Sequence, residues 1–326
     1  MTNLVRTLLI AAAVAATQIG ECQSAETIRL AVQKTGTFAW ELAVIRSRGL
    51  DKDADLSLQV RELASPEAGK VALRSDDADI IISDFLWVSR ERTLGAKLTF
   101  YPYSSALGGV MVPDTSAIRS LAELKGRKLA IAGGPIDKNW LLLQAELKRQ
   151  KIDLKQDSTI VYGAPPLLAA AMLNGEADAT VTYWNFAAAL EVKGFRRIAS
   201  VQDIVRNLGA KGPIAMLGYV FDESWGRENR DILARFIEVT RKAKAILSTS
   251  DAEWDRIAPL TGATDTATLH AYRDRYREGI PHRSVDDEEA DARMLYRVLA
   301  DIGGPDIVGP AGELDPGTFY HQLPGY

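Results

Sequence analysis

The chain has 326 residues, of which 47% are hydrophobic and 25% charged, with a formal net charge of -4 and a pI of about 5.6. This composition is ordinary for a soluble globular protein, and the length allows about two domains. No basic patch is large enough to indicate a nucleic-acid partner, since the run KRQK at 148–151 is typical of a solvated helix face.

The first 25 residues are expected to be a signal peptide. Arg6 is followed by the apolar run LLIAAAVAA at 8–16. This run is too short to span a bilayer but has the length of the apolar part of a signal peptide. Small residues at Cys22, Ser24 and Ala25 offer a cleavage zone. We therefore expect export to the periplasm; the alternative is a buried N-terminal helix.

Cys22 is the sole cysteine of the sequence. It could carry a lipid, but Glu21 stands directly before it, where a small residue would be expected. Cleavage after Ser24 or Ala25 would leave a mature protein without disulfides or thiol chemistry. No later segment has 18 apolar residues in a row, so we expect a soluble mature chain.

The region that follows contains two similar halves, each read as β–α–β–α–β. The first has β-runs at 28–32 and 56–63, and the second at 128–132 and 158–163. At an offset of 100 residues, Trp40 falls on Trp140, each in a helix that follows a glycine-containing turn. Alternation of strands and helices predicts parallel sheets with helices on both faces. A period near 100 residues is too long for a solenoid and indicates two α/β lobes.

A second pair of segments, 66–87 and 165–186, aligns at an offset of 99 residues. Each has a helix, a turn and a short apolar strand, and the strands end on Asp84–Phe85 and Tyr183–Trp184 respectively. The alternative is chance similarity between two ordinary βαβ units.

The ends of these strands are the predicted ligand site. In parallel α/β sheets, ligands bind outside the carboxyl ends of the strands, where helix N-termini point. Four turns lie there, and they are rich in aromatic and short polar side chains, which is usual for a small-molecule site. Their candidate residues are Thr35, Thr37, Phe38, Trp40, Ser83, Asp84, Phe85, Asp137, Asn139, Trp140, Tyr183, Trp184 and Asn185. Packing remains an alternative for the tryptophans and Tyr183, and helix capping for Asp84 and Asp137.

The segments at 106–116 and 212–225 are read as strands that cross between the lobes, forming a hinge. Helices are expected at 229–247 and about 251–260, 264–279 and 286–302, packing back on the first lobe. The acidic run DDEEAD at 286–291 could suggest a metal, but reads better as the first turn of a helix. The predicted divisions are a signal peptide at 1–25, lobe 1 at 26–110, lobe 2 at 111–215 and a return to lobe 1 at 216–326.

Three segments carry a resemblance to a known family. They are RSRGLDKDADLSLQVREL at 46–63, SLAELKGRKLAIAGG at 120–134 and LNGEADATVTYWNFAAALEVKG at 173–194. In their order and spacing they resemble the periplasmic solute-binding proteins of ABC importers of the nitrate, sulfonate and taurine type, over about 27–225. Binders of pyrimidine precursors are close relatives of this family.

The resemblance implies a type II-like two-lobe binder that captures a small organic solute and delivers it to an inner-membrane ABC permease. It implies a monomer without a cofactor, a metal or catalytic activity. Carried over residue by residue, the family's ligand positions fall on Thr35, Gly36, Thr37 and Phe38; on Ser83 and Asp84; on Pro135, Asp137, Lys138 and Asn139; and on Tyr183, Trp184 and Asn185. The alternative cargo is an amine or pyrimidine precursor of thiamine.

Asp84 departs from the family pattern, because members that bind anions often have a small or amide residue there. A carboxylate in the cleft repels an anion unless Lys138 or Lys34 neutralises it. Unpaired, Asp84 would favour a cationic or hydroxyl-bearing ligand.

Enzyme activity is not expected. The sequence contains no G-x-S-x-G, H-E-x-x-H, C-x-x-C, Walker A or G-x-G-x-x-G motif. His270, His282 and His321 all lie outside the predicted cleft turns. An enzyme on the same fold, the yeast pyrimidine synthase that consumes its own histidine, is therefore a poor match. A sensor or partner-binding module is a further alternative.

Overall fold

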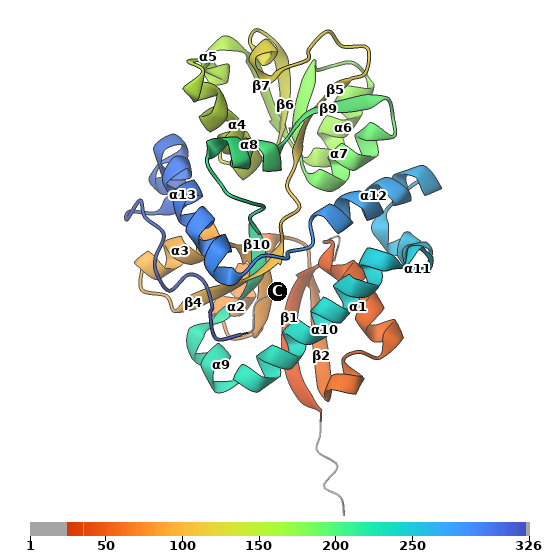
Figure 1. Ribbon diagram of the computed structural model, residues 1–326, viewed down its shortest axis with the longest axis vertical. Coiled ribbons are helices and arrows are strands. Elements are labelled where there is room, and N and C mark those ends of the chain that lie inside the picture. Colours follow the sequence, from red (N-terminus) through yellow and green to blue (C-terminus); the bar gives the residue numbers. More distant parts are fainter. Residues whose placement is uncertain (1–24, 35, 324–326) are drawn as a thin grey trace, which may run out of the picture.

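The computed structural model describes residues 25–34 and 36–323 and shows two α/β lobes, each built on a five-stranded sheet (Figure 1). The predicted two-lobe α/β fold is confirmed. The first lobe lies at the bottom of Figure 1 and the second at the top. The predicted signal peptide, apart from Ala25, lies outside the described residues, and so does the candidate site residue Thr35.

Lobe 1 contains the sheet with strand order β2-β1-β3-β10-β4. Its central strands are almost continuously apolar, because helices cover both faces of the sheet. The elements are β1 (Glu26–Gln33), α1 (Phe38–Arg48), η1 (Lys52–Ala54), β2 (Leu56–Leu63), α2 (Pro66–Arg74), β3 (Ile80–Asp84), α3 (Phe85–Thr93), β4 (Leu98–Ser104) and β10 (Leu217–Asp222).

Lobe 2 contains the sheet with strand order β7-β6-β8-β5-β9. Its elements are β5 (Gly109–Pro113), η2 (Leu121–Leu124), β6 (Lys128–Ala132), α4 (Lys138–Arg149), α5 (Leu154–Asp157), β7 (Thr159–Gly163), α6 (Pro165–Leu173), β8 (Ala179–Thr182), α7 (Trp184–Glu191), β9 (Phe195–Ser200) and α8 (Val201–Leu208).

The two sheets repeat the same arrangement. The first three β-runs of each half occupy corresponding places, as the internal repeat predicts: β2-β1-β3 in lobe 1 and β7-β6-β8 in lobe 2. The sheets are not wholly parallel, however. β10 runs antiparallel to β3 and β4, and β5 runs antiparallel to β8 and β9. Each antiparallel strand enters its sheet directly after the chain has crossed from the other lobe, which reverses its direction.

Two segments of the chain cross between the lobes, as expected, and they are irregular rather than β-strands. The chain passes from β4 to β5 through residues 105–108 and from α8 to β10 through residues 209–216. Gly108 in the first crossing must be a glycine, because an added Cβ would overlap the carbonyl oxygen of Thr182. Its N–H donates to Oδ1 of Asn139 at 3.2 Å, which ties the crossing to lobe 2.

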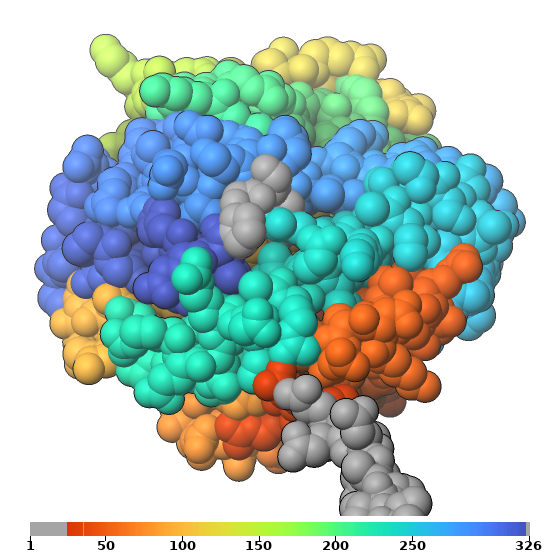
Figure 2. Space-filling model, turned by 60° about the horizontal axis from the view of Figure 1, so that its bottom comes forward, coloured from red at the N-terminus to blue at the C-terminus, as the bar shows by residue number. Residues whose placement is uncertain are grey.

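The remaining helices form a C-terminal segment that contacts both lobes, rather than the first lobe alone as expected. α10 and α11 pack on α1 of lobe 1, whereas α12 packs on α7 and α13 on α4 and α8 of lobe 2. In Figure 2 the blue part of this segment forms a belt between the two lobes. Its helices are α9 (Glu223–Glu228), α10 (Arg230–Thr249), α11 (Asp251–Thr261), α12 (Thr266–Glu278), α13 (Val285–Gly303) and α14 (Pro305–Val308).

The C-terminal segment also holds both crossings. The carbonyl oxygen of Gly279, after α12, accepts the N–H of Ser105 at 2.9 Å in the first crossing. In the second crossing, Oε2 of Glu288 accepts the N–H of Ala215 at 2.6 Å, and Oδ2 of Asp291 accepts that of Lys211 at 2.9 Å. Glu288 belongs to the acidic first turn of α13, so the run at 286–291 begins a helix.

In the part of the chain that the structure describes, no helix combines the length and apolar character that crossing a membrane requires.

Candidate functional site

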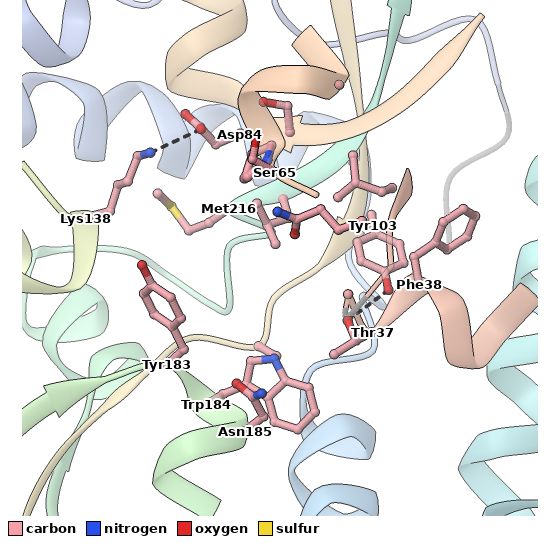
Figure 3. Close-up of a pocket in the computed structure, with 18 of the residues that line it drawn as sticks. Thr37, Phe38, Ser65, Asp84, Tyr103, Lys138, Tyr183, Trp184, Asn185 and Met216 are labelled. Carbon is pink, nitrogen blue, oxygen red and sulfur yellow. Dashed lines mark hydrogen bonds and ion pairs between the residues drawn. The ribbon is translucent and has the colours of Figure 1, made fainter. Parts of the chain in front are cut away.

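A cavity of about 650 Å³ lies between the lobes, where the carboxyl ends of strands from both sheets meet (Figure 3). Its volume is in the range typical of small-molecule sites. Eleven of the candidate residues line it: Gly36, Thr37, Phe38, Ser83, Asp84, Asp137, Lys138, Asn139, Tyr183, Trp184 and Asn185.

Other candidates do not line this cavity. Trp40 is 3% exposed, and its ring packs edge-on against Trp184 at 5.9 Å, so it supports the cavity wall from behind. Phe85 packs in the core against Phe100, and Trp140 is fully buried. Phe85 and Trp140 point from their helices into the lobes, whereas Trp40 also contacts Trp254 and Tyr272 of the C-terminal helices. Pro135 lies on an exposed turn outside the cavity.

Sequence reasoning missed the ends of the two middle strands and the crossings. Ser65 and Pro66 follow β2, and Pro165 and Pro166 follow β7, at the cavity wall. The strand-end rule would have found them if it had been applied to these strands as well. The crossings and the strands beside them contribute a further set, which depends on how the lobes are joined: Tyr103, Ala106, Leu107, Gly108, Met216 and Leu217.

Asp84 both caps a helix and pairs with a lysine of the other lobe. Its Oδ1 accepts the N–H of Trp87 at 2.9 Å, which makes it the N-cap of α3. Its Oδ2 lies 3.2 Å from Nζ of Lys138, the first residue of α4 (Figure 3). Asp84 therefore caps α3, and Lys138 neutralises its charge at the same time.

The charges around Asp84 favour its ionised form. Burial acts to raise the pKa of Asp84, but the ammonium of Lys138, the N–H of Trp87 and the charge of Lys70 together lower it below its usual value. The carboxylate of Asp84 in turn raises the pKa of Lys138. The carboxylate of Asp84 therefore faces the cavity with its negative charge offset by these neighbouring groups.

Asp137 caps α4 in the same way. Its Oδ1 accepts the N–H of Asn139 at 2.9 Å and that of Trp140 at 3.3 Å. Burial raises the pKa of Asp137 despite these hydrogen bonds. Burial and the nearby Asp137 carboxylate also raise the pKa of Tyr183, so its phenol remains protonated at neutral pH.

Two other helices begin at the cavity without a side-chain cap. Thr37 precedes α1 and Tyr183 precedes α7, and neither side chain accepts a hydrogen bond from its helix. Helix N-termini carry a partial positive charge that favours an anion. The N–H groups of Ala39 and Trp40 in α1 already donate to the carbonyl oxygens of Gly36 and Thr37. The first residues of both helices, Phe38 and Trp184, line the cavity. We define this region as the uncapped end, and that around Asp84, Asp137 and Lys138 as the capped end.

Aromatic side chains surround the uncapped end. Phe38 packs edge-on against Tyr103 at 5.6 Å, and the hydroxyl of Tyr103 lies 3.2 Å from Oγ1 of Thr37. Trp184 covers the opposite side, from lobe 2 (Figure 3). This part of the cavity can therefore enclose an apolar body beside an anionic group.

None of the described residues that line the cavity is a histidine or a cysteine. Within the described ranges, no group of three or more His, Cys, Asp and Glu side chains is arranged to hold a metal ion. The site chemistry consists of helix N-termini, amide and hydroxyl groups, aromatic rings and one inter-lobe ion pair.

Comparison with protein families gives one match that covers more than half of the chain. The family described as NMT1/THI5 like matches residues 42–250, from α1 to the end of α10. No curated protein matches the sequence significantly.

Several solved structures share the fold. The periplasmic aliphatic sulphonate binding protein SsuA from Escherichia coli is 18% identical, with a TM-score of 0.69 over 89% of this chain and 97% of its own. The alkanesulfonate-binding protein SsuA from Xanthomonas axonopodis pv. citri, bound to MOPS, is 19% identical, with a TM-score of 0.65 over 88% and 96%. An ABC transporter structure from Parabacteroides distasonis is 15% identical, with a TM-score of 0.68 over 90% and 98%. At these identities the likeness shows a common two-lobe fold.

Proposed function

The chain belongs to the NMT1/THI5-like family, and from this we propose that it is the substrate-binding component of an ABC importer. It captures a small organic anion of the sulfonate type in the cavity between its lobes. The protein acts in the periplasm after removal of its signal peptide, as a monomer, and hands the solute to an inner-membrane permease.

The observation that carries this proposal is the uncapped end of the cavity. α1 and α7 come from different lobes, yet both begin there without a side-chain cap. An anionic head group between them would interact favourably with the helix dipoles of both lobes at once. It would therefore bind the closed arrangement better than an open one, which ligand-driven closure requires.

The carboxylates of the cavity do not contradict an anionic ligand. Asp84 and Asp137 each accept N–H groups at a helix N-terminus, and Lys138 lies within 3.2 Å of Asp84. Their charges are thus compensated by groups of the protein. A sulfonate at the uncapped end would experience the two helix dipoles more strongly than these carboxylates.

Relatives of the same fold support the ligand class. The proteins from Escherichia coli and Xanthomonas axonopodis pv. citri are described as binding aliphatic sulphonate and alkanesulfonate. Their structures match 89% and 88% of this chain. Nitrate, taurine, and an amine or pyrimidine precursor of thiamine are the competing solutes.

A thermal-shift screen of the mature chain, from residue 26, tests the proposal. Ligands would include sulfonates, nitrate, carboxylates, amines, pyrimidines and sugars. A ligand that binds only the folded state raises the melting temperature by mass action. At a ligand concentration of 100 times Kd, the free energy of unfolding increases by about 2.7 kcal/mol. We expect shifts with sulfonates. Shifts confined to amines, pyrimidines or polyols would overturn the proposed ligand class, although the protein would still be a solute-binding protein.

A double variant links binding to this cavity. Tyr183→Ala with Trp184→Ala removes the aromatic wall of lobe 2, and we expect it to abolish sulfonate binding in a folded protein. Trp184 also packs against Trp40, so circular dichroism and the melting temperature of the free variant serve as the control. Unchanged affinity would place the ligand elsewhere.

A further inference from the structure

A second cavity, of about 490 Å³, adjoins the first at its capped end. We call the two the inner and outer cavities. Five residues line both of them: Glu67, Lys70, Asp84, Asp137 and Lys138. The boundary between the two spaces is therefore made of charged side chains from both lobes.

The Asp84–Lys138 ion pair spans this boundary. Asp84 projects from the end of β3 in lobe 1, and Lys138 from the start of α4 in lobe 2. Figure 3 shows the pair at one end of the inner cavity, with Thr37, Trp184 and Asn185 at the other. A solute anchored at the uncapped end would thus point its tail towards this pair.

The two partners differ in how firmly they are held. The Asp84 side chain is 11% exposed and fixed by its bond to Trp87, whereas the Lys138 side chain is 39% exposed. No second side-chain partner within hydrogen-bond distance holds the ammonium of Lys138 among the described residues. Lys138 can therefore swing away at modest cost, because an ion pair with a partly exposed side chain contributes little to stability.

The outer cavity offers apolar surface beyond the pair. This surface comes from Val71 and Ile136, which are 63% and 54% exposed and lie one on each lobe, whereas Leu86 and Trp87 behind them are buried. Its cations are engaged elsewhere: Arg90 donates to the carbonyl oxygen of Asp306 at 3.0 Å, and Arg74 pairs with Glu91. The ammonium of Lys70 and the guanidinium of Arg74 lie over the Trp87 ring, at 5.2 and 5.8 Å from its centroid. A hydrocarbon tail that enters the outer cavity can therefore contact Val71 and Ile136.

We propose that the Asp84–Lys138 pair is the end wall that sets the length of the solute, and that the outer cavity accepts the tail of longer organic anions once Lys138 moves aside. This inference rests on the proposed function, since it takes the anionic head to be bound at the uncapped end. Lys138 is the movable part and Asp84 its fixed anchor.

Linear alkanesulfonates from ethanesulfonate to octanesulfonate test the proposal by isothermal titration calorimetry. Asp84→Asn removes the charge of the anchor while asparagine still caps α3. The affinity ratio of octanesulfonate to ethanesulfonate should rise about fivefold in this variant, because the long tail no longer has to break an ion pair. Using the ratio cancels the general gain for anions that results from removing a negative charge.

Glu191→Gln is the matched control. Glu191 pairs with Arg275 of α12 at 3.1 Å, and the substitution removes one carboxylate outside both cavities. Its affinity ratio should equal that of the wild type. Lys138→Gln, which removes the other partner from a half-exposed position, should raise the ratio as Asp84→Asn does.

The outcomes separate this inference from the proposed function. Binding of sulfonates with the same chain-length profile in wild type, Asp84→Asn and Lys138→Gln would overturn the end wall and leave the proposed function intact. A rise in the ratio for Glu191→Gln as well would also overturn it, since any loss of charge would then suffice. Absence of binding by every sulfonate would overturn both.

Discussion

The two lobes share a strand order, yet corresponding helices begin in opposite ways. α1 of lobe 1 is uncapped while its counterpart α4 is capped by Asp137, and α3 is capped by Asp84 while its counterpart α7 is uncapped. Across the cleft, the capped helices face each other and so do the uncapped ones. One carboxylate in each lobe, placed at non-equivalent turns, thus converts a repeated fold into a cavity with two chemically different ends.

The two ends are also backed by different ion pairs. Behind the uncapped end, Lys244 lies 2.5 Å from Glu41 of α1, with side chains 4% and 0% exposed. At the capped end, Asp84 pairs with the partly exposed Lys138. A buried pair is costly to break from one side, whereas a partly exposed pair contributes little. The following predictions test this contrast, from the largest expected effect to the smallest.

Lys244→Ala should lower the free energy of unfolding by about 3–5 kcal/mol, because it leaves Glu41 buried without its cation. Tyr276 would still donate to Glu41 at 2.7 Å but cannot neutralise it. Urea unfolding followed by circular dichroism measures the loss. The double variant Glu41→Gln with Lys244→Met, which removes both charges, should recover much of the stability. Equal losses in single and double variants would show that packing, rather than charge, explains the effect.

Tyr183→Asp should abolish the difference between the two ends by giving α7 the carboxylate that α3 has at the equivalent position. Tyr183 has the extended backbone, φ -72° and ψ 156°, that an N-cap residue requires. A carboxylate there would compete with an anionic ligand, costing about 3 kcal/mol, or more than 100-fold in affinity, at an effective dielectric constant of about 20. Calorimetric titration with a sulfonate measures this effect.

Tyr183→Asn is the control for that comparison, since it supplies a neutral cap of the same size and also removes the ring. The loss of affinity attributed to charge is the difference between the two variants. If both bind a sulfonate equally, the anionic head group does not lie at the N-terminus of α7.

The two crossings differ in a similar way, because the first is held by a carbonyl group and the second by carboxylates. Burial raises the pKa of Glu288 to about 7, above its usual value. Between pH 5 and 7 the folded state therefore retains a proton that the unfolded state has lost. The contribution of Glu288 to the free energy of unfolding should therefore fall as the pH rises, by about 2 kcal/mol between pH 5 and 7.

Urea unfolding at pH 5, 6 and 7 checks this expectation, with Glu288→Gln as the comparison. Glutamine retains an acceptor for the N–H of Ala215 but does not titrate. The difference in unfolding free energy between the two proteins should shift in favour of the variant as pH rises. Parallel pH profiles would mean that Glu288 titrates alike in the folded and unfolded states.

The sequence was sufficient to predict the repeat and the strand-end turns, because both depend on local patterns of apolar residues, glycines and aromatics. It could not predict which carboxylates cap their helices, because capping depends on backbone angles at one residue. Pairing of Asp84 with Lys138 depends on how two lobes meet, over a separation of 54 residues. The contacts of α12 and α13 with lobe 2 were missed for the same reason: generic amphipathic helices do not specify their partner.

Asp84→Asn should have the smallest effect on stability, and it is the substitution that most directly compares the two ion pairs. Because asparagine caps as well as aspartate, the variant loses only the pairing with Lys138, worth less than about 1 kcal/mol when one partner is partly exposed. Asp84→Ala should lose about 1 kcal/mol more, through the missing cap of α3. Urea unfolding at low and high salt separates the two contributions, since salt screens the pair but not the cap. If Asp84→Asn lowered the free energy of unfolding by more than about 2 kcal/mol, the Asp84–Lys138 pair would be as costly to break as the buried pair of Lys244 and Glu41. Lys138 would then be held too firmly to act as a movable wall.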